Sequence, residues 1–175
     1  MIAARSGGSV RTSLRAGRRQ LLEAIPYHRE MAVRRMDHVG IVVDDLAAAT
    51  AFFEELGLVA QGEASVDGSW VDRIVGLEDV QADLSMMETP DGNTRLELTK
   101  FRSPPSPPGT PGAPANAVGI RHIAFLVDDL DAVLARLQAR GAELVGEVER
   151  YEDLYRLCYI RGPEGIIVEL AESIG

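Results

Sequence analysis

An internal repeat constrains the fold of this chain more than any other feature of its sequence. The segment that begins at Asp37 (DHVGIVVDDLAAATAFFEELGLVAQGE) matches the segment that begins at Arg121 (RHIAFLVDDLDAVLARLQARGAELVGE). Both contain a His, a short apolar run, the letters VDDL, a stretch of helical pattern, a Gly and a further strand-like run. A match of this length indicates two copies of one structural unit, which bury their apolar faces together.

Each copy predicts the same order of elements. The runs HVGIVV and HIAFLV are short, apolar and rich in β-branched residues, as buried strands are. A helix is expected next in each copy. The stretch begins at an acidic residue that can cap the helix N-terminus, and it ends at a Gly that suits the helix C-terminus. These bounds are Asp44 or Asp45 and Gly57 in the first copy, and Asp128 or Asp129 and Gly141 in the second.

Three further strands are expected in each copy. The first copy is expected to contain strands at 58–63, 82–88 and 94–101, with a short helical turn at 70–75. The second copy is expected to contain strands at 143–150, 155–161 and 166–171. Each module is therefore βαβββ, and we predict an α+β fold in which two tandem modules form a curved mixed sheet around a cleft.

The pattern divides the chain into four parts. We expect an N-terminal arm at 1–35, a first module at 36–102, a linker at 103–117 and a second module at 118–175. The linker holds six prolines, so it cannot form a regular helix or a central strand. Its length allows the modules to pair within one chain or across a dimer.

The arm differs in composition from the modules. It contains eight Arg and two Glu, and it lacks the apolar run of a secretory signal. Three interpretations remain: a dispensable arm or upstream start-site extension, a packing or dimer arm, and a targeting segment. Met31 and Met36 are alternative start residues, and His28 is interpreted as structural or solvent-exposed rather than as a ligand.

Charge, hydrophobicity and cysteine content limit the classes of protein to which this chain can belong. The net charge of -9, less the +6 of the arm, leaves -15 on residues 36–175, which argues against a nucleic-acid surface there. No run approaches the roughly 18 apolar residues of a membrane span. Cys158 is the one cysteine, so no intramolecular disulfide can form, and a cytoplasmic location is expected. We predict that Cys158 packs in the core, with a pocket-lining or reactive thiol as the alternative.

Two His and two Glu occupy matching places in the two copies. His38 and His122 begin the first strand of each module, while Glu97 and Glu169 interrupt the apolar last strands. A buried carboxylate is costly unless it is paired or coordinated. The four residues predict an N2O2 site for one divalent metal ion, among Zn, Ni, Co, Mn and Fe. The alternative is a lineage that kept the fold without the metal.

Over residues 36–172 the sequence resembles the vicinal-oxygen-chelate superfamily. This superfamily includes glyoxalase I, methylmalonyl-CoA epimerase, extradiol dioxygenases and fosfomycin or bleomycin resistance proteins. Glu97 within LELT, His122 within RHIA and the closing Glu169 resemble the glyoxalase I ligands, and His38 matches the first ligand. The resemblance implies a homodimer, a small-molecule substrate, and a metal ion that stabilises an oxyanion on that substrate.

The leading functional hypothesis is a metal-dependent lyase or isomerase of glyoxalase type. It would move a proton next to the carbonyl of a small α-keto, thiohemiacetal or acyl-thioester substrate, with Glu169 as the base and Glu97 as its pseudosymmetric partner. The alternatives are an epimerase-like enzyme, which typically has Gln where Glu97 stands, a non-catalytic protein that sequesters an antibiotic or other ligand, and an extradiol-type dioxygenase. No residue pattern for glutathione recognition is present.

Strand alternation nominates further residues of the pocket. Arg95 and Thr99 share the face of Glu97, and Arg95 is a candidate anchor for a substrate carboxylate or phosphate, or alternatively a rim arginine paired with an acid. Ala124 shares the face of His122, and Ile167 shares that of Glu169. Trp70 and Arg73 are candidates for a lid, although Trp70 is more readily explained as a core residue.

Overall fold

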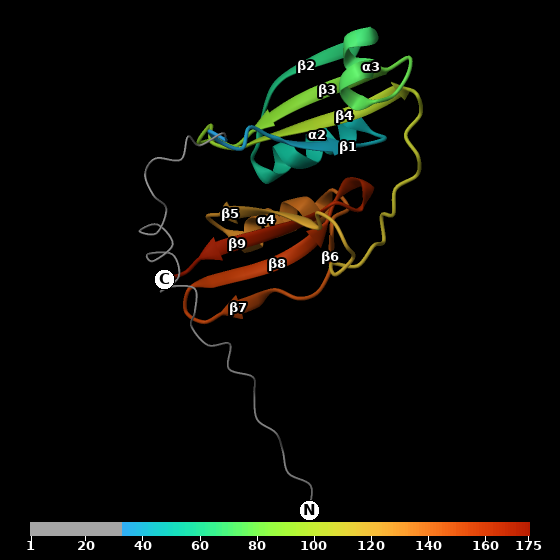
Figure 1. Ribbon diagram of the computed structural model, residues 1–175. Coiled ribbons are helices and arrows are strands. Elements are labelled where there is room, and N and C mark those ends of the chain that lie inside the picture. Colours follow the sequence, from blue (N-terminus) through green and yellow to red (C-terminus); the bar gives the residue numbers. More distant parts are fainter. Residues whose placement is uncertain (1–32) are drawn as a thin grey trace, which may run out of the picture. The chain divides into compact units, whose positions relative to one another are not determined.

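The computed structural model describes residues 33–175, of which Asp37–Gly175 form one compact unit. Most of the arm, including His28 and Met31, therefore lies outside the described residues. The unit contains two sheets and three α-helices, as the α+β prediction requires (Figure 1).

The first sheet is built from the first copy of the repeat. Its strand order is β1-β4-β3-β2, with β1 parallel to β4 and the other neighbours antiparallel. The strands are β1 (Val39–Val42), β2 (Val59–Asp67), β3 (Gln81–Glu88) and β4 (Arg95–Ser103). Helix α2 (Leu46–Leu56) connects β1 to β2, and α3 (Ser69–Val75) connects β2 to β3.

The second sheet repeats this plan. Its strand order is β5-β9-β8-β6, with β7 also paired to β8, and β5 runs parallel to β9. The strands are β5 (His122–Val127), β6 (Glu143–Leu144), β7 (Glu149–Tyr151), β8 (Tyr155–Arg161) and β9 (Ile167–Ser173). Helix α4 (Leu130–Ala139) follows β5, and a 3-10 turn, η1 (Pro163–Gly165), precedes β9.

One strand of the second module differs from the prediction. The single strand expected at 143–150 is divided into β6 and β7, which pair with opposite ends of β8. Gly146 lies in the interruption, and a Gly in a strand interior weakens pairing because it has no side chain to pack. Val145 still donates its backbone N–H to the carbonyl of Tyr159, so the chain stays beside β8.

The helices begin at the aspartates that the repeat aligns. The side chain of Asp45 accepts a hydrogen bond from the backbone N–H of Ala48, and that of Asp129 accepts one from Ala132, each at 2.9 Å. Each bond satisfies one of the free N–H groups in the first turn. Gly57 ends α2 in the left-handed conformation with φ 117°, which disfavours residues that carry a Cβ.

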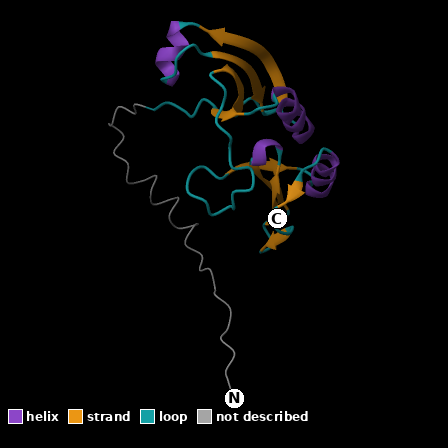
Figure 2. Cartoon of the chain, turned by 90° about the vertical axis from the view of Figure 1, so that its right-hand side faces the viewer, coloured by secondary structure: helices purple, strands orange, loops and turns teal. Residues whose placement is uncertain are grey.

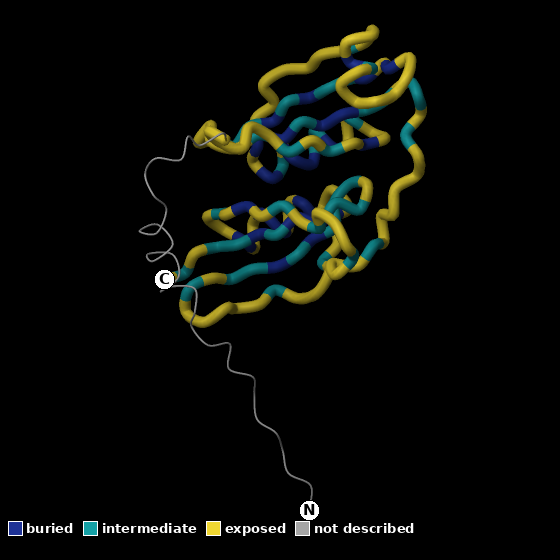
Figure 3. The backbone as a smooth tube through the Cα atoms, in the orientation of Figure 1, coloured by how far each residue is buried: buried dark blue, intermediate teal, exposed yellow. Residues whose placement is uncertain are grey.

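The main core joins the two modules. Helices α2 and α4 contact each other and lie on the same side of the unit (Figure 2). The buried residues of these helices are Ala49, Phe52, Phe53 and Leu56 on α2, and Leu130, Val133, Leu134 and Leu137 on α4. They pack in one cluster with Leu96, Leu98, Val168 and Leu170 from strands β4 and β9. Figure 3 draws the buried stretches of the chain in dark blue.

Polar contacts also connect the modules. Arg136 and Arg140 on α4 both form ion pairs with Glu55 on α2. At the other end, Glu164 of η1 accepts hydrogen bonds from the backbone N–H groups of Asp44 and Asp45, which precede α2. Because Asp44 follows β1 and Glu164 precedes β9, the C-terminal end of β1 lies near the N-terminal end of β9.

None of the helices in the described part of the chain is long and apolar enough to cross a lipid bilayer.

Candidate metal centre

The second module brings its predicted His and Glu together. The parallel pairing of β5 with β9 sets Ala124 opposite Glu169, and His122 lies two residues earlier on the same face. The Nε2 atom of His122 lies 3.1 Å from Oε2 of Glu169. The His122 side chain is 38% exposed and that of Glu169 is 21% exposed, so the pair is open to a ligand.

Tyr159 on β8 completes this group. It pairs with Glu169 across the sheet, and its ring packs on that of His122 with centroids 4.9 Å apart and planes inclined by 34°. Burial raises the pKa of the Tyr159 hydroxyl, and the charge of the Glu169 carboxylate and a hydrogen bond with it raise this pKa further. The hydroxyl therefore stays protonated at neutral pH beside the Glu169 carboxylate.

The geometry of the His122 and Glu169 pair fits a shared metal ion. Metal bonds of about 2.0–2.2 Å to His nitrogen and carboxylate oxygen, at angles between octahedral and tetrahedral, separate neighbouring ligand atoms by roughly 3.0–3.5 Å. The observed separation of 3.1 Å falls in this range. The pair can therefore supply one nitrogen and one oxygen ligand.

The first module has a corresponding pair on two neighbouring strands. Gly40 of β1 lies opposite Glu97 of β4, and His38 precedes Gly40 by two residues, on the same face. Here the surroundings are different, because Asp37 contacts both His38 (Nδ1 to Oδ2, 3.1 Å) and Arg95 (Nη2 to Oδ1, 2.6 Å). Asp37 thus orients the His38 ring and holds the guanidinium of Arg95.

The two pairs do not meet within one chain. Among residues 33–175, no three or more His, Cys, Asp and Glu side chains lie close enough together to hold one metal ion. The physical reason is the direction of the edge strands. The contact between Glu164 and Asp44 brings the N-terminal ends of β9 and of its parallel neighbour β5, where His122 lies, to the end of β1 that is farther from His38. Each chain therefore presents two separate pairs of candidate ligands, one in each module.

The structure also places the other predicted pocket residues, and it corrects the interpretation of one of them. Thr99 lies beside Glu97, with its Oγ1 3.5 Å from Oε1 of that residue. Arg95 is engaged with Asp37, so a role as substrate anchor would require it to exchange partners. The interpretation of Trp70 as a core residue is wrong, because its side chain on α3 is 52% exposed. Arg73, on the same helix, is also exposed.

Neighbouring positions complete the face of the second pair. Ala124 is exposed beside His122, whereas Ile167 is buried although it shares the face of Glu169. Cys158 is 1% exposed on the opposite face, which confirms its packing role, and burial raises the pKa of its thiol. A thiol of this kind is protonated at neutral pH and is a poor nucleophile.

The sequence analysis missed Tyr159 and Asp37. Tyr159 was within reach of the alternation argument, because Tyr155, Leu157, Tyr159 and Arg161 must share one face of β8. Its contact with His122 crosses the intervening strand β9, and only the sheet order reveals that neighbourhood. Asp37 was visible as the neighbour of His38, but its bond to Arg95 depends on the pairing of β1 with β4.

A comparison with protein families identifies the fold's relatives. Residues 35–170 match the family model of the Glyoxalase/Bleomycin resistance protein/Dioxygenase superfamily. The chain belongs to this superfamily. Membership agrees with the resemblance drawn from the repeat and from its His and Glu positions.

Relatives within the superfamily cover most of the chain. A glyoxalase family protein from Bacillus cereus has a crystal structure that is 49% identical, with a TM-score of 0.81, over 83% of this chain and 98% of that one. The uncharacterized protein YaeR of Escherichia coli is 30% identical over 147 residues, which are 82% of this chain and 99% of YaeR. The chain therefore spans nearly the full length of both relatives.

A more distant structure shares the fold alone. A mutant of the fosfomycin resistance protein FosX from Listeria monocytogenes, solved with Mn(II) and 1S,2S-dihydroxypropylphosphonic acid, is 16% identical, with a TM-score of 0.52, over 79% of this chain and 89% of that one.

Proposed function

We propose that the chain is a metal-dependent lyase or isomerase of glyoxalase type, which acts next to the carbonyl of a small α-keto, thiohemiacetal or acyl-thioester substrate. The observation that carries this proposal is the His122 and Glu169 pair, whose ligand atoms are 3.1 Å apart and whose carboxylate contacts Tyr159. His and carboxylate ligands suit Zn, Ni, Co, Mn or Fe.

The proposed centre is completed by a second copy of the chain. His38 and Glu97 of one copy would join His122 and Glu169 of the other, because the two pairs do not gather within one chain. The faces that carry these residues also leave apolar side chains in water. Val42 follows His38 on its face and is 51% exposed, and Leu126 follows His122 on its face and is 74% exposed. Burial of such positions against a second copy stabilises a homodimer.

The residues then divide the chemistry between them. When bound, the metal ion supplies a positive charge that stabilises the oxygen of the substrate carbonyl as negative charge develops there. Glu169 accepts the proton from the carbon next to that carbonyl and returns it to the neighbouring atom, so no proton is gained or lost overall. Tyr159 lies opposite Glu169 on the neighbouring strand, and Glu97 is the pseudosymmetric candidate for the same proton transfer.

The test is the metal content of protein purified without chelator. We expect about one transition metal ion for every two His and Glu pairs in the wild type, and its loss in His122→Ala and in the double variant Glu97→Gln plus Glu169→Gln. Glu172→Gln is the matched control, because Glu172 lies on the same strand but forms its ion pair with Arg156 on the opposite face. An unchanged metal content in the double variant, with the fold intact, would exclude this centre.

Turnover separates the proposed enzyme from a protein that only sequesters a ligand. The enzyme should convert glyoxalase or epimerase substrates repeatedly once it is loaded with Ni, Co, Zn or Mn, and Glu169→Gln should lower kcat by about 100-fold or more. Stoichiometric binding without turnover, for every metal and substrate, would favour the sequestering protein.

A further inference from the structure

Arg121 differs from most arginines of residues 37–175 in having no carboxylate partner. Six others each form an ion pair with an Asp or Glu: Arg95, Arg102, Arg136, Arg140, Arg150 and Arg156. Arg121 instead donates from Nη2 to the carbonyl oxygen of Ala113 at 3.1 Å. Its Nε atom is buried and has no hydrogen-bond partner.

A buried guanidinium N–H without an acceptor is costly, because the group has lost its water and gained nothing in return. The protein around Arg121 has a formal charge of -15 over residues 36–175 and therefore offers many carboxylates. None of those described lies within ion-pair distance of this side chain. Arg121 is thus a cation that the fold positions but does not neutralise.

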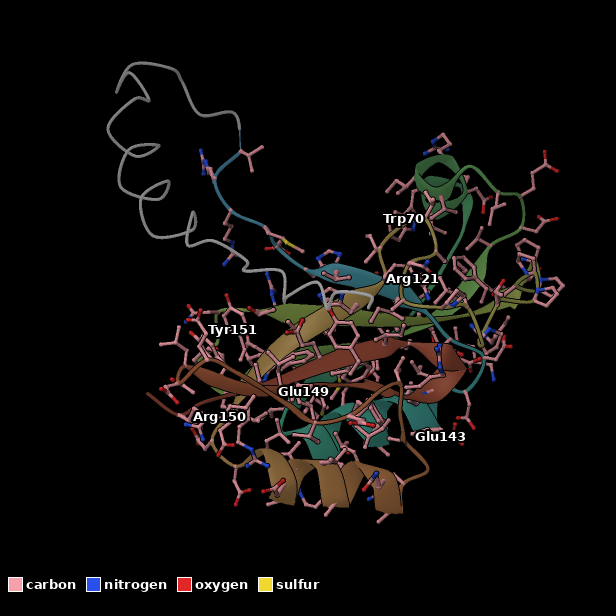
Figure 4. The ribbon with its side chains drawn as sticks, turned by 90° about the horizontal axis from the view of Figure 1, so that it is seen from below. Trp70, Arg121, Glu143, Glu149, Arg150 and Tyr151 are labelled. Carbon is pink, nitrogen blue, oxygen red and sulfur yellow. The ribbon has the colours of Figure 1, made fainter. Side chains whose placement is uncertain are left out.

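A pocket of about 690 Å³ is lined in part by Arg121. It lies along the free edges of β1 and β5, and the linker covers part of it. Its lining includes Arg121, His122 and Glu164, together with the apolar side chains of Ile41, Ile123 and Ile166. Arg121 is labelled in Figure 4, which views the unit from below. The pocket thus borders both the unpaired cation and the predicted metal ligand His122.

Glu164 is the carboxylate that lines this pocket, but it is already engaged. Its Oε1 atom accepts hydrogen bonds from the backbone N–H groups of Asp44 (3.0 Å) and Asp45 (3.4 Å). The negative charge of Glu164 is therefore directed toward the start of α2. Glu164 therefore repels an anion in the pocket less strongly than a carboxylate without hydrogen-bond donors would.

We propose that this pocket binds the anionic end of the substrate, a carboxylate or a phosphate-type group, through the guanidinium of Arg121. The inference rests on the proposed function, because His122, a proposed metal ligand, lines the same pocket as Arg121. Arginine suits this task, since its planar N–H groups match the oxygens of carboxylates and phosphates. Arg95, the anchor expected from the sequence, is occupied by Asp37.

Arg161 provides the matched control. It also donates to the Ala113 carbonyl (Nη2, 3.2 Å), and further to the carbonyls of Pro111 and Gly165, but it does not line the pocket. Arg121 and Arg161 therefore share the task of fixing the linker. They differ in that Arg121 lines the pocket and Arg161 does not, so a comparison of the two separates anion binding from linker anchoring.

The test is calorimetric titration of metal-free, full-length protein with inorganic phosphate and, separately, with acetate, at matched ionic strength. We expect binding in the wild type, a loss of affinity of about tenfold or more in Arg121→Gln, and a change within about twofold in Arg161→Gln. Stronger binding of phosphate would assign a phosphate-type substrate, and stronger binding of acetate a carboxylate.

Three results would overturn the inference: no binding of either anion to the wild type, unchanged binding in Arg121→Gln, or equal losses in Arg121→Gln and Arg161→Gln. The metal content of the same preparations before chelation keeps the two proposals apart. Metal retained in the wild type without anion binding would contradict this inference alone. Anion binding in a protein that never holds metal would contradict the metal centre alone.

Discussion

At the scale of single residues, the contacts of Tyr159 connect structure to chemistry. Its ring packs on that of His122, and Tyr159 pairs with Glu169 across the sheet, so one side chain lies beside both members of this His and Glu pair. Second-layer contacts of this kind fix ligand orientation in metal sites, and their loss commonly lowers metal affinity or activity 10- to 100-fold. A tyrosine that contacts two proposed ligands is therefore part of how the site is built.

The titration of Tyr159 gives a direct check of this contact. Burial, and then the Glu169 carboxylate, place its pKa above the ordinary 10.0. Because the folded-state pKa is raised, the stabilisation from this contact is present below pH 10 and is lost as the pH rises through the folded-state value. An ultraviolet titration of the metal-free wild type should therefore show one tyrosine that ionises above pH 10, and this tyrosine should be missing from the titration of Tyr159→Phe.

Glu169→Gln supplies the control for that titration. Removing the carboxylate charge should lower the pKa of Tyr159 part of the way toward 10, because the effect of burial remains. A Tyr159 that ionises at or below pH 10 in the wild type, or one that is unaffected by Glu169→Gln, would contradict the described contact.

At the scale of elements, the turn between β3 and β4 depends on one carboxylate. Asp91 accepts hydrogen bonds from the Thr89 hydroxyl (2.6 Å) and from the side chain and backbone of Asn93, and these bonds lower its pKa to about 2. The depressed pKa means that the contribution of Asp91 to stability is present above pH 3.8 and is lost as the pH falls toward about 2.

An NMR titration of the Asp91 carboxyl carbon would measure this value. We expect a midpoint near 2 in the wild type and a clear rise toward 3.8 in Thr89→Val, which removes the bond with the largest effect. A midpoint that Thr89→Val leaves unchanged would show that the Thr89 bond does not hold this turn.

The start of α4 offers a second test at the same scale. Asp129 caps the helix through the N–H of Ala132, and its neighbour Asp128 is exposed and makes no cap bond. Asp129→Ala should therefore lower the free energy of unfolding by about 1 kcal/mol. Asp128→Ala should change it by less than about 0.5 kcal/mol. Equal effects in urea unfolding would contradict the assignment of the cap.

The sequence predicted the positions of the helices and strands better than it predicted which of them contact each other. The repeat located β1, β5 and both helices, because caps and apolar periods are local signals, and Asp45 and Asp129 confirm them. The sequence did not predict that the strand expected at 143–150 is divided near Gly146, or that Trp70 is exposed. Both features depend on which other parts of the chain pack against these residues. The separation of the two His and Glu pairs depends on the direction of two edge strands, about which no local pattern carries information.

At the scale of the whole molecule, the proposed centre requires two copies. Within one chain, α2 and α4 pack against each other and join the modules by a shared core. This packing leaves the faces that carry His38 and His122 uncovered, with exposed Val42 and Leu126 beside them. A symmetric dimer that joins unlike His and Glu pairs would contain two complete centres, each with ligands from both copies.

Complementation between inactive variants tests this central claim most directly. One variant carries His38→Ala and Glu97→Gln, and the other carries His122→Ala and Glu169→Gln. Each should bind no metal alone. After the two are mixed, partly unfolded and refolded together, random pairing should restore about a quarter of the wild-type metal content, because each mixed dimer holds one intact centre. Metal content that stays at zero in verified mixed dimers would contradict a centre shared between two copies.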